Sequence, residues 1–314
     1  MPLNGAERAF FGSVALVLGQ QSEQRWQIDV DRACDYVDRV AAFQQSEAPA
    51  DTIAFTRPIG LHVSGAEPFA QTDDLERLLA RATRHAMRAE VLTNACWVED
   101  RAAADAVVRR FGGKIHLLTI LTGRKEIDRR GIATLEWLLL ALRQANMSFQ
   151  LLVGVGAGSP FPKELLGLEV VNCDTSVIRV EPLAYGANAG WPAHYLLTAP
   201  PRYARCAELM GFVIAPGGEV YPCANGIGLA QLRLGNMQTQ SVGEIVEGAL
   251  AKADLHRLRD EGPYFLYDGL RRCRRAALLP REFVSSCDFH RQLLTNAAAA
   301  KLHVEDLSAE ASAP

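Results

Sequence analysis

The chain has 314 residues, of which 49% are hydrophobic and 22% are charged, as in globular proteins with a large buried core. Its formal net charge of −3 gives no electrostatic reason to expect binding to nucleic acid or to an anionic membrane. No basic segment precedes an apolar one at the N-terminus, and no apolar run approaches the roughly 18–20 residues of a membrane span. We therefore expect a cytoplasmic protein. Seven cysteines, an odd number in a long intracellular chain, favour reduced or metal-bound thiols over a disulfide framework.

Short β-rich runs alternate with amphipathic helix patterns up to about residue 182. The predicted strands are 13–19, 59–64, 89–94, 114–121, 148–158 and 176–183. The predicted helices are 28–43, 72–88, 100–113 and 132–145. Thr72 is expected to cap the second helix, and Cys34 lies on the apolar face of the first as a buried thiol. Six strands joined by helices predict an α/β fold with a parallel sheet, open or curled into a partial barrel.

The pattern changes after about residue 195. Two strand-like runs flank Pro216-Gly217-Gly218 and predict a hairpin. Ser241 and Glu244 have the spacing of a capping box, which predicts a helix through about Arg259. The RRCRR run at 271–275 is more typical of a solvated face than of a phosphate site. We therefore expect domains at 1–195 and 196–300, followed by a disordered tail at 301–314.

Polar motifs follow three of the predicted parallel strands. GAEP follows the second strand, LTNA ends the third, and EPLAYG ends the sixth. Ligands bind at the carboxyl ends of parallel strands, where Gly65 allows close approach and Glu67 offers a carboxylate to an ammonium group. The alternative is a tight turn made by Gly65 and Pro68, with Glu67 solvated.

Four of the seven cysteines lie in the last third of the chain: Cys206, Cys223, Cys273 and Cys287. Four thiolates suit one [4Fe-4S] cluster or one structural zinc ion. Their wide spacing is unlike the compact pairs of zinc ribbons, and four unrelated thiols remain the alternative. Cys96 and Cys173 stand alone beside strand ends and are expected to be packing residues.

The order and spacing of these motifs resemble a radical S-adenosylmethionine (radical SAM) protein with a C-terminal SPASM or twitch-type extension. HVSGAEP resembles the family's GGEP, VLTNA its TNG, TGRKEIDRRG the stretch after its fourth strand, and GEVYPC with Cys206 its SPASM signature. The resemblance covers roughly residues 13–290. It implies a partial (β/α)6 barrel with a smaller α+β extension. It also implies that Gly65, Ala66, Glu67 and Asn94 form the S-adenosylmethionine corner, and that His290 could replace Cys273 as a cluster ligand.

One departure from the family pattern concerns the loop after the first strand. The family carries C-x3-C-x2-C there, whereas this loop reads LGQQSEQRWQ and contains neither cysteine nor histidine. Its side chains cannot replace soft thiolates, so the resemblance implies that the catalytic cluster is absent and assigns no catalytic residue. Residual S-adenosylmethionine binding is left open. A second hypothesis is that the loop fills the vacant space and that Arg25 pairs with Glu67.

Three functions remain open. The first is a non-catalytic binding or accessory subunit in the maturation of a peptide or protein, which would bind a peptide or protein substrate or an active radical SAM maturase. The second is an enzyme. Either a partner chain completes its radical cluster, or it is a non-radical catalyst that uses Glu67, Asn94, Asp128 or Glu181. The third is a zinc-stabilised scaffold.

Overall fold

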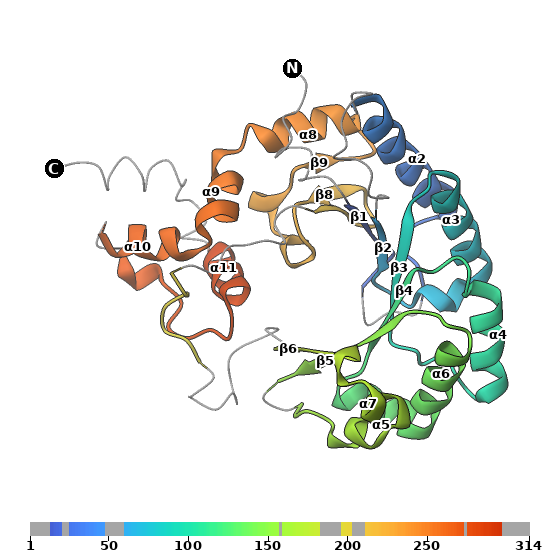
Figure 1. Cartoon of the computed structure of the whole chain (residues 1–314). Helices are drawn as coiled ribbons and strands as arrows, with labels where there is room; N and C mark the ends of the chain where they lie inside the picture. Colours follow the sequence, from blue (N-terminus) through green and yellow to red (C-terminus); the bar gives the residue numbers. More distant parts are fainter. Residues whose placement is uncertain are drawn as a thin grey trace. The chain divides into compact units, whose positions relative to one another are not determined.

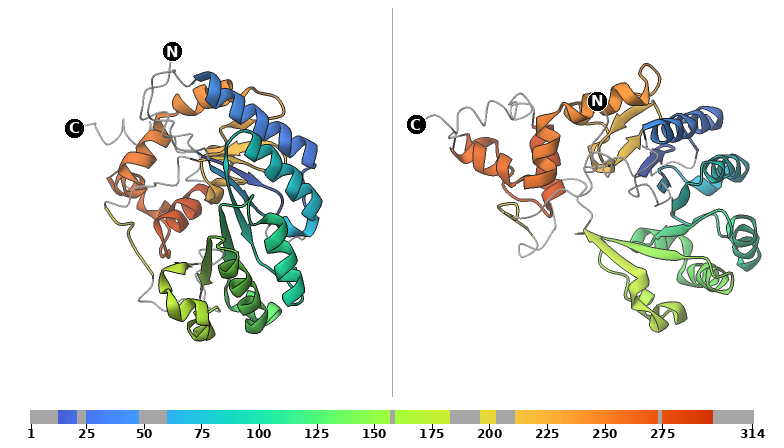
Figure 2. Two further views of the ribbon diagram at one scale, coloured as in Figure 1. Left: turned by 45° about the vertical axis from the view of Figure 1, so that its right-hand side comes forward. Right: turned by 45° about the horizontal axis from the view of Figure 1, so that its top comes forward.

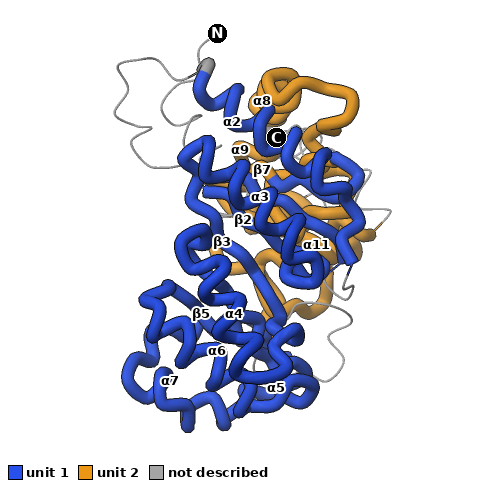
Figure 3. The backbone as a smooth tube through the Cα atoms, turned by 90° about the vertical axis from the view of Figure 1, so that its right-hand side faces the viewer, with its two compact units in different colours: residues 1–181, 213–218 blue, residues 182–212, 219–314 orange. Residues whose placement is uncertain are grey.

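The computed structural model describes residues 13–20, 25–47, 60–156, 159–182, 196–202, 211–272 and 275–296. The chain forms two compact units, residues 1–181 with 213–218 (unit 1) and residues 182–212 with 219–314 (unit 2), as Figure 3 shows. The expected tail at 301–314 lies outside the described residues. Within the described ranges, no helix combines the length and hydrophobicity that crossing a membrane requires.

Unit 1 is built on a parallel sheet. Its strands are β1 (Ser13–Val17), β2 (Gly60–Ser64), β3 (Arg88–Thr93), β4 (Leu117–Leu121), β5 (Phe149–Val155) and β6 (Ile178–Pro182). They lie in the order β6-β5-β4-β3-β2-β1, and the neighbouring strands from β1 to β5 pair in parallel. Strand β7 (Phe212–Ile214) lies beside β1. The six predicted strands are therefore present. Five of them are shorter than predicted, and β3 begins and ends one residue earlier than predicted.

Helices cover one face of this sheet (Figures 1 and 2). They are α2 (Val30–Glu47), α3 (Thr72–Arg84), α4 (Arg101–Phe111) and α6 (Ile132–Gln144), and the shorter α5 (Arg124–Arg130) and α7 (Glu169–Cys173) follow β4 and β5. Alternate strand residues such as Leu16, Val63 and Ile120 are fully or almost fully buried, as the period of two requires. Cys34 is buried in α2, which confirms its assignment to the core.

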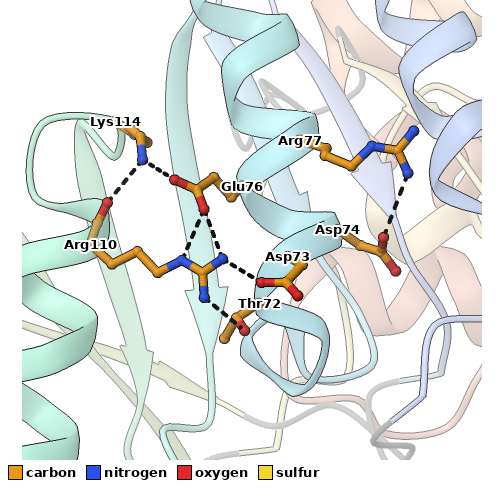
Figure 4. A network of polar contacts seen from close by, with 7 residues as sticks. All are labelled: Thr72, Asp73, Asp74, Glu76, Arg77, Arg110 and Lys114. Atoms are coloured by element: carbon orange, nitrogen blue, oxygen red, sulfur yellow. Dashed lines mark hydrogen bonds and ion pairs between the residues drawn. The ribbon is translucent and has the colours of Figure 1, made fainter.

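A polar network joins α3 to α4 on the surface of unit 1 (Figure 4). The Arg110 guanidinium donates to Glu76 at 2.7 Å and to the Thr72 hydroxyl at 3.2 Å, and Lys114 also donates to Glu76. The prediction that Thr72 caps α3 is wrong. Gln71 is the N-cap, and Thr72 is the first residue of the helix. The Thr72 hydroxyl accepts a hydrogen bond from Arg110 instead of capping the helix.

The described part of unit 2 contains short strands and short helices. They are β8 (Glu219–Tyr221), β9 (Gly235–Asn236), α8 (Val242–Leu250), α9 (Ala253–Glu261), α10 (Tyr264–Arg272), α11 (Ser286–Thr295) and the 3-10 helix η6 (Ala224–Gly226). The expected turn at Pro216-Gly217-Gly218 is present, since the Gly218 N–H donates to the Ala215 carbonyl oxygen at 2.8 Å. Strands β8 and β9 pair antiparallel.

The capping box of α8 is confirmed, because Ser241 and Glu244 each accept a hydrogen bond from the other's backbone N–H. The single helix expected through Arg259 is instead two helices. Lys252 adopts an extended conformation (φ −83°, ψ 94°), which ends the helical path after Ala251 and starts α9. The buried side chains of α8, such as Ile245 and Ala249, and those of α9, such as Leu258, therefore belong to two short helices.

Candidate functional site

The GAEP motif forms a tight corner directly after β2. Gly65 (φ 70°) and Ala66 (φ 47°) both adopt left-handed backbone conformations. A Cβ atom on Gly65 would lie 2.3 Å from the carbonyl oxygen of Gly19, so only glycine fits there. Glu67 then caps the 3-10 helix η2 (Pro68–Gln71) by accepting the Phe69 N–H at 3.1 Å. The corner therefore turns the Glu67 carboxylate inward.

Glu67 is 2% exposed, and its carboxylate accepts hydrogen bonds from Thr93 at the end of β3 and from Asn94, the next residue. The Thr93 hydroxyl donates to Oε1 at 2.7 Å, and the Asn94 N–H donates to Oε2 at 3.0 Å. Burial raises the pKa of Glu67, while these hydrogen bonds and the charge of Arg130 act to lower it. The expectation that Glu67 and Asn94 lie together is met, and the alternative of a solvated Glu67 is wrong because its carboxylate is enclosed by the protein.

Arg130, at the end of α5, completes this corner. Its Nη1 donates to the Asn94 carbonyl oxygen at 2.6 Å, whereas its Nε and Nη2 are buried and have no hydrogen-bond partner among the described residues. Burial lowers the pKa of Arg130, although the nearby charges of Glu126 and Glu67 act in the opposite direction. The backbone of Asn94 thus lies between the buried Glu67 carboxylate and the Arg130 guanidinium, and it contacts both.

Sequence reasoning missed Thr93 and Arg130 as members of this corner. Thr93 lies in the LTNA motif and Arg130 in the TGRKEIDRRG motif. The two motifs therefore indicated the right segments of the chain, but not these two residues. Of the other acidic candidates, Asp128 is exposed and Glu181 is half-buried, and both have other partners. Asp128 lies 3.6 Å from Arg124, and Glu181 lies 2.5 Å from Arg179.

The segment after β1 is bound to the corner at 64–66 by backbone hydrogen bonds. The Ala66 N–H donates to the Gln20 carbonyl oxygen at 3.0 Å, and the Leu18 N–H donates to the Ser64 carbonyl oxygen at 2.7 Å. Trp26 is only 8% exposed. The hypothesis that Arg25 pairs with Glu67 is wrong, because Arg25 is exposed while Glu67 is buried and bonded to Thr93 and Asn94.

Two of the four candidate cysteine ligands lie in the described part of unit 2. Cys223 precedes η6 and is 9% exposed, and Cys287 is half-buried in the first turn of α11. The Arg291 guanidinium of α11 donates to the Asn225 carbonyl oxygen at 2.8 Å. Cys287 and Arg291 are four residues apart on one face of the helix. This bond therefore holds the Cys287 face of α11 against the loop that follows Cys223.

The remaining candidate ligands of a metal or cluster are Cys206, Cys273 and His290. Cys206 and Cys273 lie outside the described residues. His290 is 8% exposed, and burial lowers its pKa to about 4, so its imidazole is neutral at pH 7. Across the described ranges, no group of three or more His, Cys, Asp or Glu side chains has the arrangement of a metal site. Cys96 and Cys173 were both predicted to be packing residues. Cys96 is half-buried, whereas Cys173 is exposed on α7, so the prediction for Cys173 is wrong.

Comparisons with known proteins identify a family model that matches part of the chain and solved structures with a similar fold. Residues 206–275, which begin at Cys206 and include Cys223 and Cys273, match the family model of SPASM, an iron-sulfur cluster-binding domain. No curated protein matches the chain.

Two of the similar solved structures are of anSMEcpe. Hexahistidine-tagged anSMEcpe with bound AdoMet has 14% identity and a TM-score of 0.51, covering 95% of this chain and 97% of that one. Native anSMEcpe with bound AdoMet and Cp18Cys peptide has 14% identity and a TM-score of 0.52, covering 92% and 97%. These likenesses confirm the expected fold class: a parallel α/β sheet like a radical SAM partial barrel, with a smaller C-terminal α+β extension that carries the SPASM match.

Proposed function

We propose that this chain is a radical SAM-like protein without a radical centre of its own, which acts as a binding or accessory subunit in the maturation of a peptide or protein. One observation carries the proposal. The loop that would need three thiolates contains no cysteine or histidine, and its Gln20 carbonyl accepts the Ala66 N–H at the corner where a cofactor would be held.

The chemistry of the donor set supports this proposal. Iron-sulfur clusters are held by thiolates and less often by imidazole, and the loop offers only amide, hydroxyl, carboxylate, guanidinium and indole groups. The Glu67 carboxylate, which would accept a ligand ammonium group, already accepts hydrogen bonds from Thr93, Asn94 and Phe69. The residues at this end of unit 1 therefore do not fit a catalytic cluster.

The C-terminal unit, in contrast, would hold one auxiliary cluster under this proposal. The SPASM match supports an iron-sulfur group, and Cys223 and Cys287 would supply two of its thiolates, with Cys206, Cys273 or His290 completing the set. A zinc ion with the same cysteines is the alternative. The peptide context rests on the similar structure of anSMEcpe with a bound peptide.

The test is anaerobic purification with iron, sulfide and zinc analysis, together with calorimetric titration by S-adenosylmethionine. We expect about four irons and four sulfides per chain and no heat of binding. Cys223→Ala should abolish the iron, whereas Cys34→Ala, a matched change of a thiol buried in α2, should leave it unchanged. About eight irons, or tight S-adenosylmethionine binding, would overturn the proposal.

One observation favours a second function, an enzyme whose radical cluster is completed by a partner chain. Within the part of the chain that the structure describes, the buried Nε and Nη2 atoms of Arg130 have no hydrogen-bond partner, so they could bind an anionic group. Binding of S-adenosylmethionine that is lost in Arg130→Gln would support this second function. Absence of binding in both proteins would exclude it for the isolated chain.

A further inference from the structure

Two arginines of unit 2 lie on tyrosine side chains. Arg202 Nε donates to the Tyr264 hydroxyl at 3.1 Å, and Arg271 Nη1 donates to the Tyr267 hydroxyl at 3.2 Å. The guanidinium carbons lie 5.5 Å and 5.6 Å from the centres of the same rings. The two rings are 5.7 Å apart. We call these four residues the Arg–Tyr layer.

A buried aromatic cluster supports this layer from behind. The Tyr267 ring lies 6.2 Å from Phe289, which lies 4.9 Å from Phe283, and both phenylalanines are 0% exposed. Phe283 also pairs through its backbone with Leu197, five residues before Arg202. The layer is therefore fixed by α10, α11 and the segment at 196–202, so ordering it on binding would cost little entropy.

The charge of Arg271 is the feature that points to a ligand. Its guanidinium is exposed, and among the described residues its partners are the hydroxyl group and the aromatic ring of Tyr267, neither of which is charged. The carboxylate of Asp268, which also lies in α10, forms an ion pair with Arg272 at 2.5 Å. A guanidinium has five N–H donors, and Arg271 uses one of them for Tyr267. The remaining donors form a fork that suits a carboxylate.

Arg257 provides the contrast within the same unit. Its guanidinium carbon lies 4.4 Å from the Phe265 ring centre, as in the Arg–Tyr layer, but its Nε donates to the Glu261 carboxylate at 3.0 Å. Its charge is therefore neutralised by a carboxylate on its own helix, and it serves as the matched control.

We propose that the Arg–Tyr layer binds an acidic segment of a peptide or protein, with a carboxylate on Arg271 and the tilted rings of Tyr264 and Tyr267 beside it. This inference rests on the proposed function, because it names the chemistry of the peptide or protein that the chain would bind.

The test uses the full chain and a fluorescein-labelled peptide of alternating Glu and Gly, with a Lys–Gly peptide of equal length as the comparison. Fluorescence anisotropy at low salt should show tighter binding of the Glu–Gly probe. Arg271→Gln should weaken that binding about tenfold, the size expected for a lost charge-assisted pair, and Arg257→Gln should leave it unchanged. Equal binding of both probes, or equal effects of both variants, would overturn the inference.

Two further measurements separate this inference from its alternatives. An oligouridylate that binds more tightly than the Glu–Gly probe, and depends on Arg271, would overturn the acidic-peptide assignment in favour of phosphate recognition. S-adenosylmethionine titration of the same preparations separates the two proposals. If it gives no heat and the Glu–Gly probe fails to bind, only the inference about the layer falls. If the probe binds through Arg271 but S-adenosylmethionine also binds tightly, only the proposed function falls.

Discussion

The Thr93 hydroxyl donates to the Glu67 carboxylate at 2.7 Å and thereby ties the end of β3 to the corner that follows β2. The same oxygen accepts hydrogen bonds from the Ala95 N–H at 2.9 Å and from the Trp97 indole N–H at 3.1 Å. One donated and two accepted bonds use the full capacity of a hydroxyl group. Thr93 therefore connects Glu67, Ala95 and Trp97 at the corner, although the sequence motif indicates its neighbour Asn94 as the site residue.

Replacing Thr93 with valine keeps the shape of the side chain but removes this hydroxyl. The buried Glu67 carboxylate loses one donor, and the Ala95 and Trp97 N–H groups lose their acceptor. We expect the free energy of unfolding to fall by about 1–3 kcal/mol, measured by urea denaturation.

Thr119→Val is the matched control for this change. Thr119 lies in β4 and is half-buried, between the buried residues Leu118 and Ile120. Its replacement should change the free energy of unfolding by less than about 0.5 kcal/mol. Equal losses in the two variants would mean that the hydroxyl of Thr93 has no special role at the corner.

The parallel sheet could be predicted from the sequence because its strands are short β-rich runs separated by strongly periodic helices. Leu75, Leu78, Leu79 and Ala82 of α3, for example, follow the three- and four-residue spacing of one buried face. Helix α5 was not predicted. Its seven residues, RKEIDRR, contain one buried side chain, Ile127, so no apolar period reveals it.

The corner itself could be predicted only in part. Gly65 and Glu67 stand out because glycine and an acidic residue interrupt an apolar run. The contribution of Arg130 depends on where α5 ends relative to β3, which is a relation between distant segments that no local pattern encodes. The Arg25–Glu67 hypothesis failed for the same reason: closeness in a motif does not decide which of two arginines approaches a carboxylate.

Glu67→Gln should alter how stability depends on pH. Burial raises the pKa of Glu67 in the folded state above its unfolded value of about 4.3, so the folded protein binds a proton more readily than the unfolded chain. The contribution of Glu67 to stability is then fully present below about pH 4 and is lost as the pH rises through the folded-state pKa. The free energy of unfolding of the wild type, relative to Glu67→Gln, should therefore fall as the pH rises from about 4 through the folded-state pKa of Glu67.

Glu90→Gln tests the sign of this effect. The hydrogen bond to His62, 2.9 Å away, lowers the pKa of Glu90, with burial acting against it. A lowered pKa gives a contribution that is present above the unfolded value and lost as the pH falls. The two variants should therefore show opposite trends in urea denaturation across the acidic range. The same trend in both would contradict the assignment of Glu67 as a desolvated carboxylate.

The network in Figure 4 should stabilise unit 1 only weakly and in a salt-dependent way. Arg110 donates to Glu76, Asp73 and Thr72 at the protein surface, where water and ions screen the charges. Arg110→Gln should lower the melting temperature slightly at low salt and leave it unchanged at about 1 M salt. A loss that is the same at both salt concentrations would show that Arg110 acts through packing on the Phe111 ring instead.

Gly65→Ala should be among the most destabilising changes at the corner. The new Cβ would lie 2.3 Å from the Gly19 carbonyl oxygen and 2.6 Å from Val17 Cγ1, on a backbone with φ of 70°. The first of these neighbours is backbone and cannot rotate away, so the loop after β1 would have to move off the corner. We expect a loss of at least about 2 kcal/mol in the free energy of unfolding, measured by urea denaturation.

Gly113→Ala separates this steric effect from the general cost of replacing a glycine. A Cβ on Gly113 meets no atom within 4 Å. Its replacement reduces the conformational freedom of the unfolded chain and should be neutral or stabilising by up to about 1 kcal/mol. If Gly65→Ala were tolerated as well as Gly113→Ala, the loop would be able to leave the corner at little cost. The space beside Glu67 would then be open to a ligand, and the argument that the loop's own contacts occupy it would fail.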